Sequence, residues 1–195
     1  DTFVVTGDDK LFDSAGLMQD TFAGGASAAS TYDQILLGTT GTAVTVVATD
    51  NWSTISGVEQ LAASTNDQVI SLTLGASAET AGINRITLAA DTNATGSNVV
   101  SVAAYTTGVT IVGSAGVDTI TGGSAADTIT GGAGADVISA GAGDDILNYA
   151  LVGDLFTASG TAIVDTSIAG GTGTDTIKLG TTGTAAAIVD SFSWT

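Results

Sequence analysis

The chain has 195 residues, of which 44% are hydrophobic, and its formal net charge at pH 7 is −17 because 20 acidic residues outnumber three basic ones. This length and composition suit a folded domain and exclude a disordered polypeptide. The charge argues against nucleic acid and anionic membranes as partners. The chain has no Cys and no His, which excludes disulfides and the usual zinc and transition-metal sites, so a bound metal ion would need oxygen ligands.

The acidic residues are almost all Asp, which supplies 18 of the 20. Asp is the short carboxylate that tight turns and calcium sites favour. The chain also has 27 Gly and no Pro, a composition typical of many short strands joined by glycine turns. No apolar run approaches the roughly 18 residues of a membrane-spanning helix, so no membrane insertion is expected.

The first segment, residues 1–53, begins with an irregular part at 7–31 whose apolar residues are expected to form a short helix that caps or flanks a coil. These residues are Leu11, Phe12, Leu17, Met18 and Phe22. Strand-forming sequence follows, and Trp52 is expected to pack in the core or at the edge of a coil.

A long internal repeat links the two ends of the chain. The sequence LGTTGTA at 37–43 recurs at 179–185, an offset of 142 residues, and the match extends to Trp52 with Trp194 and to Asp1 with Asp145. We therefore expect residues 1–53 to be the end of one tandem unit, matching 145–195, and residues 149–195 to be the start of the next. Both ends of the chain are then expected to lie inside a longer, repeated polypeptide.

The middle segment, residues 54–112, contains strand-like stretches that begin near Val69, Ile83, Asn98 and Gly108. Apolar and polar residues alternate within them, as in half-buried strands. The polar connections at 75–82 and 91–97 are too short for the crossover helices of an ordinary α/β domain. The spacing favours successive coils of a parallel β-helix.

Residues 113–148 have a period of nine. The four repeats are GSAGVDTIT at 113–121, GGSAADTIT at 122–130, GGAGADVIS at 131–139 and AGAGDDILN at 140–148. Each has an Asp at the same phase, at positions 118, 127, 136 and 145. Two residues later comes one aliphatic residue, which suits a short strand with a single side chain in a narrow core; these are Ile120, Ile129, Ile138 and Leu147.

The phase of the Asp residues predicts two carboxylate ladders. If each 18-residue coil holds two repeats, Asp118 and Asp136 stack on one edge while Asp127 and Asp145 stack on the other. Glycine permits turns whose carbonyls point inward, and Asp adds a carboxylate, so together they make an all-oxygen cage. Each ladder would be repulsive without a cation. The alternative is a metal-free solenoid with solvated Asp turns.

The repeat GGAGADVIS resembles the nonapeptide G-G-x-G-x-D-x-U-x of hemolysin-type (RTX) calcium-binding proteins, in which U is a large aliphatic residue. The resemblance implies an all-β fold, a right-handed parallel β-helix or β-roll solenoid with Gly/Asp calcium-binding turns. It also implies that Ca²⁺ lies between consecutive turns on one edge, held by two Asp carboxylates and by carbonyls of the turns. The implied ligands are Asp118, Asp127, Asp136 and Asp145, with carbonyls around Gly113, Gly116, Gly122, Gly123, Gly131, Gly132, Gly134, Gly141 and Gly143.

Three repeats depart from this pattern, because Ser114 replaces the second Gly, Ala125 the third and Ala140 the first. We therefore expect one or two well-formed sites in 113–148. The sequence GGTGTDTIK at 170–178 is expected to form an isolated extra turn around Asp175.

No catalytic constellation is visible: the chain lacks His, Cys, a nucleophile-elbow motif and a phosphate-binding loop. A calcium-dependent β-helix polysaccharide lyase would need a basic residue near the metal, and Arg85, the only Arg, is far from the Asp ladders in sequence. The family resemblance, which extends to bacterial S-layer proteins and large RTX adhesins, implies a non-catalytic module of a secreted cell-surface protein. It further implies type I secretion and self-association into a lattice or filament. An adhesin stalk or a glycan-binding module is the alternative.

Overall fold

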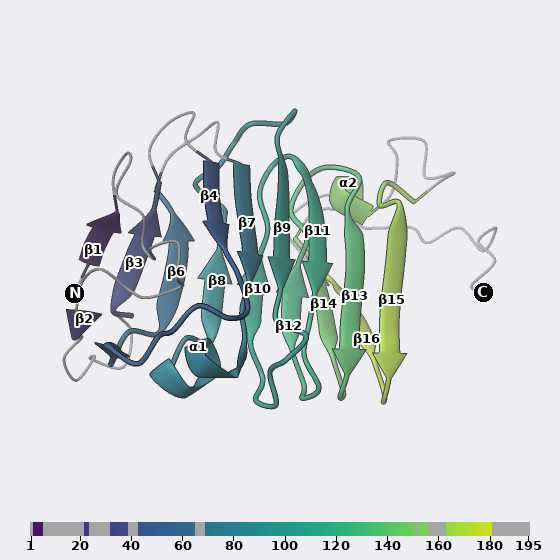
Figure 1. The fold of residues 1–195 in the computed structure, drawn as a ribbon. Coiled ribbons are helices and arrows are strands. Elements are labelled where there is room, and N and C mark those ends of the chain that lie inside the picture. Colours follow the sequence, from purple (N-terminus) through teal and green to yellow (C-terminus); the bar gives the residue numbers. More distant parts are fainter. Residues whose placement is uncertain are drawn as a thin grey trace.

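The computed structural model describes residues 2–5, 22–23, 32–38, 43–64, 69–150, 152–155 and 163–180. Two parallel sheets dominate it (Figure 1). The first sheet contains, in spatial order, β1 (Thr2–Val5), β3 (Gln34–Leu37), β6 (Gln60–Ala63), β8 (Arg85–Thr87), β10 (Thr110–Val112), β12 (Thr128–Thr130), β14 (Ile146–Tyr149) and β16 (Thr176–Leu179). The second sheet contains β15 (Ser167–Thr172), β13 (Val137–Ala142), β11 (Val117–Thr121), β9 (Ser97–Ser101), β7 (Val69–Thr73) and β4 (Ala43–Val46).

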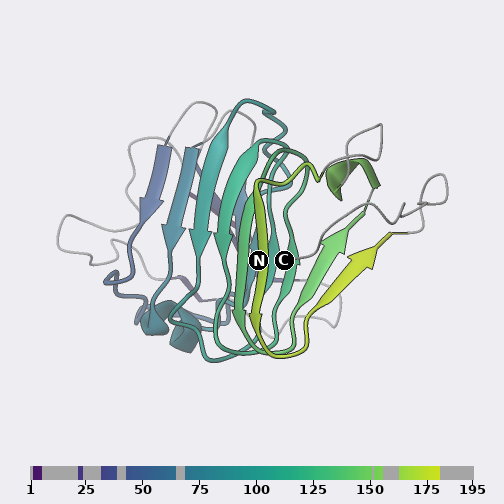
Figure 2. The same cartoon turned by 90° about the vertical axis from the view of Figure 1, so that its right-hand side faces the viewer.

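The chain alternates between the two sheets, so each pair of strands makes one coil of a solenoid. From β6 onward every strand of one sheet is followed along the chain by a strand of the other, and all recorded pairings between coils are parallel. Strands of the two sheets run in opposite directions, as Figure 1 and the end-on view of Figure 2 show. The prediction of an all-β parallel solenoid is therefore confirmed.

The length of a coil changes along the solenoid while the register of the first sheet is kept. Thr128 pairs with Thr110 and with Ile146, and the matching Asp residues are 18 apart, as predicted for two nonapeptides per coil. Between β3 and β8 the equivalent spacing is 25 or 26 residues. The coil that follows β14 is lengthened to 30 residues by an insertion that contains α2 (Val152–Leu155).

The core lies between the sheets and is thicker at the N-terminal end. There, large side chains such as Leu37, Trp52, Leu61 and Leu72 are at most 1% exposed, so the core packing expected of Trp52 is confirmed. In the nonapeptide coils one aliphatic side chain per repeat fills the space, and Ile120, Ile129, Ile138 and Leu147 are at most 1% exposed, as predicted.

Two local predictions were wrong. The connection at 75–82, expected only to be a short polar connection without a helix, carries the short helix α1 (Ala76–Ala81), which ends at Gly82 with a φ of 106°. Phe22 does not belong to a helix; it lies in β2 (Phe22–Ala23), which pairs with β5 (Ile55–Ser56). The other residues expected to form that helix lie outside the described residues. No helix within the described ranges is long and apolar enough to cross a membrane.

The strand pairs at the two ends of the first sheet are formed by the two copies of the long repeat. The strand β1 pairs with β3 at one end, and β14 pairs with β16 at the other; these pairs carry the aligned sequences. The rest of the second copy, including Trp194, lies outside the described residues. The division into tandem units stays a prediction.

Candidate metal centre

The nonapeptide turns occupy two edges of the solenoid. Turns that lead from the second sheet to the first lie at the lower edge in Figure 1, and they include 122–127, 140–145 and 170–175. Turns that lead back lie at the upper edge, where 113–116 and 131–136 precede β11 and β13, and where α2 lies before β15. Successive Asp residues of the array therefore fall on alternate edges.

The Asp residues stack as predicted, through hydrogen bonds from backbone to side chain. At the upper edge, the amide of Asp118 donates to Oδ1 of Asp136 at 2.9 Å. At the lower edge, the amide of Asp127 donates to Oδ1 of Asp145 at 2.8 Å, and the amide of Asp145 donates to Oδ1 of Asp175 at 3.1 Å. The four array carboxylates are at most 1% exposed, which contradicts the alternative of solvated Asp turns.

Neutral groups end both ladders on their N-terminal side. Asn98 lies in register with Asp118, and its side-chain amide donates to Oδ1 of that carboxylate at 3.1 Å. At the lower edge the amide of Val109 donates to Oδ1 of Asp127 at 2.8 Å. One oxygen of each array carboxylate is therefore satisfied by the coil before it, without a metal ion.

The second carboxylate oxygen divides the turns into two kinds. In turns 113–118 and 122–127 it is capped by the backbone of its own turn: Ser114 N donates to Asp118 Oδ2 at 2.6 Å, and Gly123 N donates to Asp127 Oδ2 at 2.7 Å. We call these two the closed turns. Their carboxylates are satisfied within the protein.

In turns 131–136 and 140–145 this cap is missing. The Oδ2 atoms of Asp136 and Asp145 are buried and accept no hydrogen bond from the part of the chain that the structure describes. We call these two the open turns. Their second and fourth residues are glycines with positive φ, between 104° and 122°, namely Gly132, Gly134, Gly141 and Gly143. Gly123, at the equivalent position of a closed turn, does not have a positive φ.

The sign of φ explains the missing cap. A positive φ at the second residue accompanies a flip of the peptide plane that precedes it, as between type I and type II turns. The N–H of the second residue then no longer points toward the Asp. Only glycine adopts this conformation without strain. Turn 170–175 has the same signature at Gly171 and Gly173, with φ values of 102° and 128°. The open conformation therefore recurs at three of the five nonapeptide turns.

Carbonyl oxygens of neighbouring coils approach these glycines closely. A Cβ atom on Gly132 would collide with the carbonyl oxygen of Ser114, and one on Gly141 with that of Gly123. Asp136 Oδ2 similarly leaves no room for a Cβ on Gly131. Because these residues are glycines, backbone and carboxylate oxygens can pack closely at the turns. A side chain at any of these positions would push the oxygens apart.

The remaining predicted glycines also lie in tight turns, but without a positive φ. Gly113 and Gly122 abut the carbonyls of Gly131 and Ala140, and Gly116 abuts that of Gly96. They allow the coils to stack closely.

The electrostatics of the ladders oppose ionised carboxylates. Burial raises the pKa of Asp118 and Asp127 above the ordinary value. Burial raises the pKa of Asp136 to about 7, and the carboxylates of Asp165, Asp118 and Asp154 add to the effect. A bound cation would remove this penalty, because it favours the charged form.

The oxygens present fit a calcium ion. Ca²⁺ takes six to eight oxygen ligands, including carboxylates and backbone carbonyls, in a flexible arrangement. Among the described residues no group of three or more His, Cys, Asp or Glu side chains is placed to hold a metal ion. An ion in an open turn would therefore rest on one or two carboxylates, with turn carbonyls completing its shell.

Sequence reasoning missed three residues that belong to this geometry. Gly171 and Gly173 have the positive φ of an open turn, and the consensus spacing GGTGTD would have identified them. Asp165 lies beside Asp136 at the upper edge, where Asp136 N donates to its Oδ1 at 3.0 Å. No sequence signal identifies Asp165, because it follows an insertion and not a nonapeptide.

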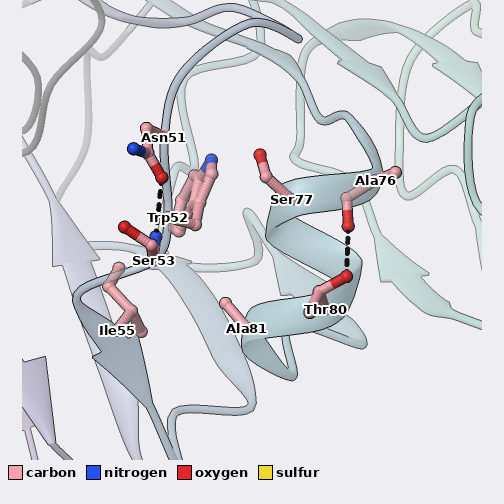
Figure 3. A pocket seen from close by; sticks show the side chains of 8 residues that line it. All are labelled: Asn51, Trp52, Ser53, Ile55, Ala76, Ser77, Thr80 and Ala81. Carbon is pink, nitrogen blue, oxygen red and sulfur yellow. Dashed lines mark hydrogen bonds between the residues drawn. The ribbon is translucent and has the colours of Figure 1, made fainter.

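A cavity of about 530 Å³ lies away from the ladders, between residues 51–55 and α1 (Figure 3). Its lining is Asn51, Trp52, Ser53, Ile55, Ala76, Ser77, Thr80 and Ala81. None of these side chains titrates near neutral pH, and Trp52 is 0% exposed, so it offers no open face for stacking. The cavity therefore offers no acid–base pair.

Comparison with known families agrees with the geometry of the array. Residues 110–148 match the RTX calcium-binding nonapeptide repeat in four copies. The predicted RTX repeats are thereby confirmed: this stretch is an array of RTX repeats, which bind calcium ions. No curated protein and no solved structure matches the chain. The resemblance to S-layer proteins and adhesins stays a prediction.

Proposed function

We propose that the chain is a non-catalytic, calcium-stabilised structural module of a secreted bacterial cell-surface or S-layer-like tandem-repeat protein. The observation that carries the proposal is the pair of buried, uncapped Oδ2 atoms of Asp136 and Asp145 in the open turns. Burying a charged group without a partner is costly, and a Ca²⁺ ion bound there supplies the missing positive charge. The ion then links consecutive coils through carboxylates and carbonyls.

The thin core explains why the array would need such a link. Each nonapeptide buries one Ile or Leu, which contributes about 1.5–3 kcal/mol. Ordering the backbone costs roughly 1–2 kcal/mol for each residue. Apolar burial alone does not offset that cost over nine residues, so ions at the turns are the natural additional source of stability.

Secretion is consistent with this use of calcium. Extracellular calcium modules have dissociation constants of about 0.1–1 mM, which suits the high calcium concentration outside cells. RTX family resemblance implies that the chain is exported unfolded and folds outside the cell. The similar pairing of β1 with β3 and of β14 with β16 supports tandem units within one solenoid.

The rival lyase function receives no support from Arg85. Its Nε donates to Oε1 of Gln60 at 2.8 Å, and its guanidinium lies 5.0 Å from the ring centroid of Tyr32. The strand β8, which carries Arg85, is three strands away from β14 in the first sheet. Arg85 is therefore not placed beside the candidate ions.

Paired variants test which turns hold calcium. Asp136→Asn with Asp145→Asn removes the charge from the open turns, whereas Asp118→Asn with Asp127→Asn removes it from the closed turns. Calorimetric titration with Ca²⁺ should show that the first pair loses most of the bound calcium and that the second keeps most of it. Equal retention by both pairs would contradict the assignment of calcium to the open turns.

Electron microscopy tests the surface-lattice part of the proposal. The purified chain with Ca²⁺ should form ordered sheets or filaments that disperse in EDTA. Separate particles under both conditions would contradict self-association and favour the adhesin stalk.

A further inference from the structure

The nonapeptide array ends at the upper edge without a further nonapeptide to follow turn 131–136. After β14 the chain makes the insertion that contains α2 and then enters β15 (Figure 1). In this coil Asp165 approaches the open turn, since the amide of Asp136 donates to its Oδ1 at 3.0 Å. Asp165 is 7% exposed and lies outside the matched repeats, which end at residue 148.

Tyr149 fixes the other oxygen of the same carboxylate. Its hydroxyl donates to Oδ2 of Asp165 at 2.6 Å, and its side chain is 3% exposed. Both oxygens of Asp165 are thereby held in place beside Asp136. Asp136 itself is 0% exposed, and its Oδ2 accepts no hydrogen bond within the described ranges.

The charges at this place are all of one sign. The groups that act electrostatically on Asp136 are Asp165, Asp118 and Asp154. Two adjacent buried carboxylates, one with an uncapped oxygen, are a poor arrangement for the protein alone. They are a suitable one for a cation that prefers oxygen.

We propose that Asp165 and Asp136 together bind a calcium ion at the upper edge, with Tyr149 as a positioning residue that orients Asp165. The inference rests on the proposed calcium-stabilised function and extends it to a site that half belongs to a non-repeat insertion. Backbone carbonyls of the open turn supply further oxygens. Asp165 therefore takes the place in the upper ladder that the Asp of a further nonapeptide would occupy.

Terbium luminescence gives a readout specific to this site. Tb³⁺ replaces Ca²⁺ at oxygen sites and emits when a nearby tyrosine is excited, so Tyr149 reports on an ion bound by Asp165. The whole chain should show tyrosine-sensitised emission that excess Ca²⁺ displaces. Tyr149→Phe should remove most of this emission and weaken calcium binding at one site by about tenfold, as loss of an outer-shell partner does. Tyr105→Phe, at the buried Tyr before β10, is the matched control and should keep the emission.

The ligand itself is tested by Asp165→Asn, whose amide oxygen still accepts the hydrogen bond from Asp136 N. This variant should lose the Tyr149-sensitised emission and one bound calcium ion, whereas Asp175→Asn at the lower edge should keep the emission. Full emission and unchanged calcium stoichiometry in Asp165→Asn would overturn the inference. Full emission in Tyr149→Phe would overturn it independently, even if Asp165→Asn failed to fold. Absence of calcium binding by the parent chain would instead contradict the proposed function.

Discussion

The backbone conformation of the second residue in each nonapeptide determines whether the Asp is capped by its own turn. Ser114 and Gly123 donate their amides to the carboxylates of Asp118 and Asp127. Gly132, with a φ of 104°, leaves Asp136 uncapped. The same nine-residue motif thus forms both closed turns, which need no ion, and open turns, which do. The two kinds differ in the orientation of the peptide that precedes the second residue.

Exchanging the residue at this position should convert one kind of turn into the other. In Gly132→Ser, the side chain disfavours the positive φ, so the turn is expected to adopt the closed conformation of Ser114, in which the amide caps Asp136. That hydrogen bond is worth about 1 kcal/mol. Thermal melting in EDTA should therefore be unchanged or higher, and the increase in melting temperature on adding Ca²⁺ should be smaller.

The control for this substitution is Gly153→Ala, because a Cβ on Gly153 has open space around it. It should leave both melting temperatures close to those of the parent. A Gly132→Ser variant with an undiminished calcium response would show that the closed turn also binds the ion.

The raised pKa of Asp136 predicts how pH affects the metal-free protein. A folded-state pKa of about 7, above the ordinary value of 3.8, means that the native state binds the proton more tightly than the unfolded state. This contribution to stability is complete below about pH 4 and is lost as pH rises through 7. Melting temperature in EDTA should therefore fall between pH 5 and pH 8, and less steeply in Asp136→Asn. A melting temperature that rises over this range in the parent but not in the variant would contradict the raised pKa.

The sequence predicted the phase of the Asp ladders but not the state of each turn. The closed turns are the ones in which Ser114 replaces the second Gly or Ala125 replaces the third. Ala140 replaces the first Gly, yet its turn is open. The consensus alone does not say which of these three substitutions changes the conformation of the turn. Asp165 was not predictable, because its proximity to Asp136 depends on where an insertion of irregular length returns to the second sheet. The first failure concerns a turn conformation that the consensus does not rank, and the second concerns a contact that local sequence does not encode.

At the scale of strands and coils, the two sheets keep their register while the connections vary in length. In the array, each strand of three to six residues buries one large aliphatic side chain, whose immediate neighbours in the strand are more exposed. Because alternation is a local pattern, the sequence predicted these strands well. The helix α1 was missed, although its Ala and Glu residues favour helix formation.

A tertiary contact holds α1 in place. Oε1 of Glu79 accepts the amides of Thr106 and Thr107 from the next coil, at 2.8 and 2.7 Å. Thr106 and Thr107 are 27 and 28 residues from Glu79, so local sequence patterns do not predict these hydrogen bonds.

The single aliphatic residue of each repeat should carry most of its packing energy. Ile129→Ala, at a fully buried position in β12, should lower the free energy of unfolding by about 2–5 kcal/mol in calcium. Ile146→Ala, on the adjacent strand with its side chain 38% exposed, should change it by roughly 0.5 kcal/mol. Denaturant titrations at saturating Ca²⁺ measure both. Similar losses in the two variants would contradict the description of a one-residue core.

At the scale of the molecule, the solenoid has two sources of stability. The N-terminal coils are long and surround large buried side chains, whereas the RTX coils are short, thinly packed and rich in buried carboxylates. The net charge of −17 adds a general repulsion that bound calcium would reduce. Calcium is therefore expected to stabilise the C-terminal half and to matter less for the rest.

Hydrogen exchange by mass spectrometry in calcium and in EDTA tests this most directly. Removing Ca²⁺ should sharply reduce the protection of amides in β11 to β14 and in β15 and β16, while β6, β7 and β8 stay protected. Equal protection of the RTX coils with and without calcium would contradict the claim that bound ions hold them together.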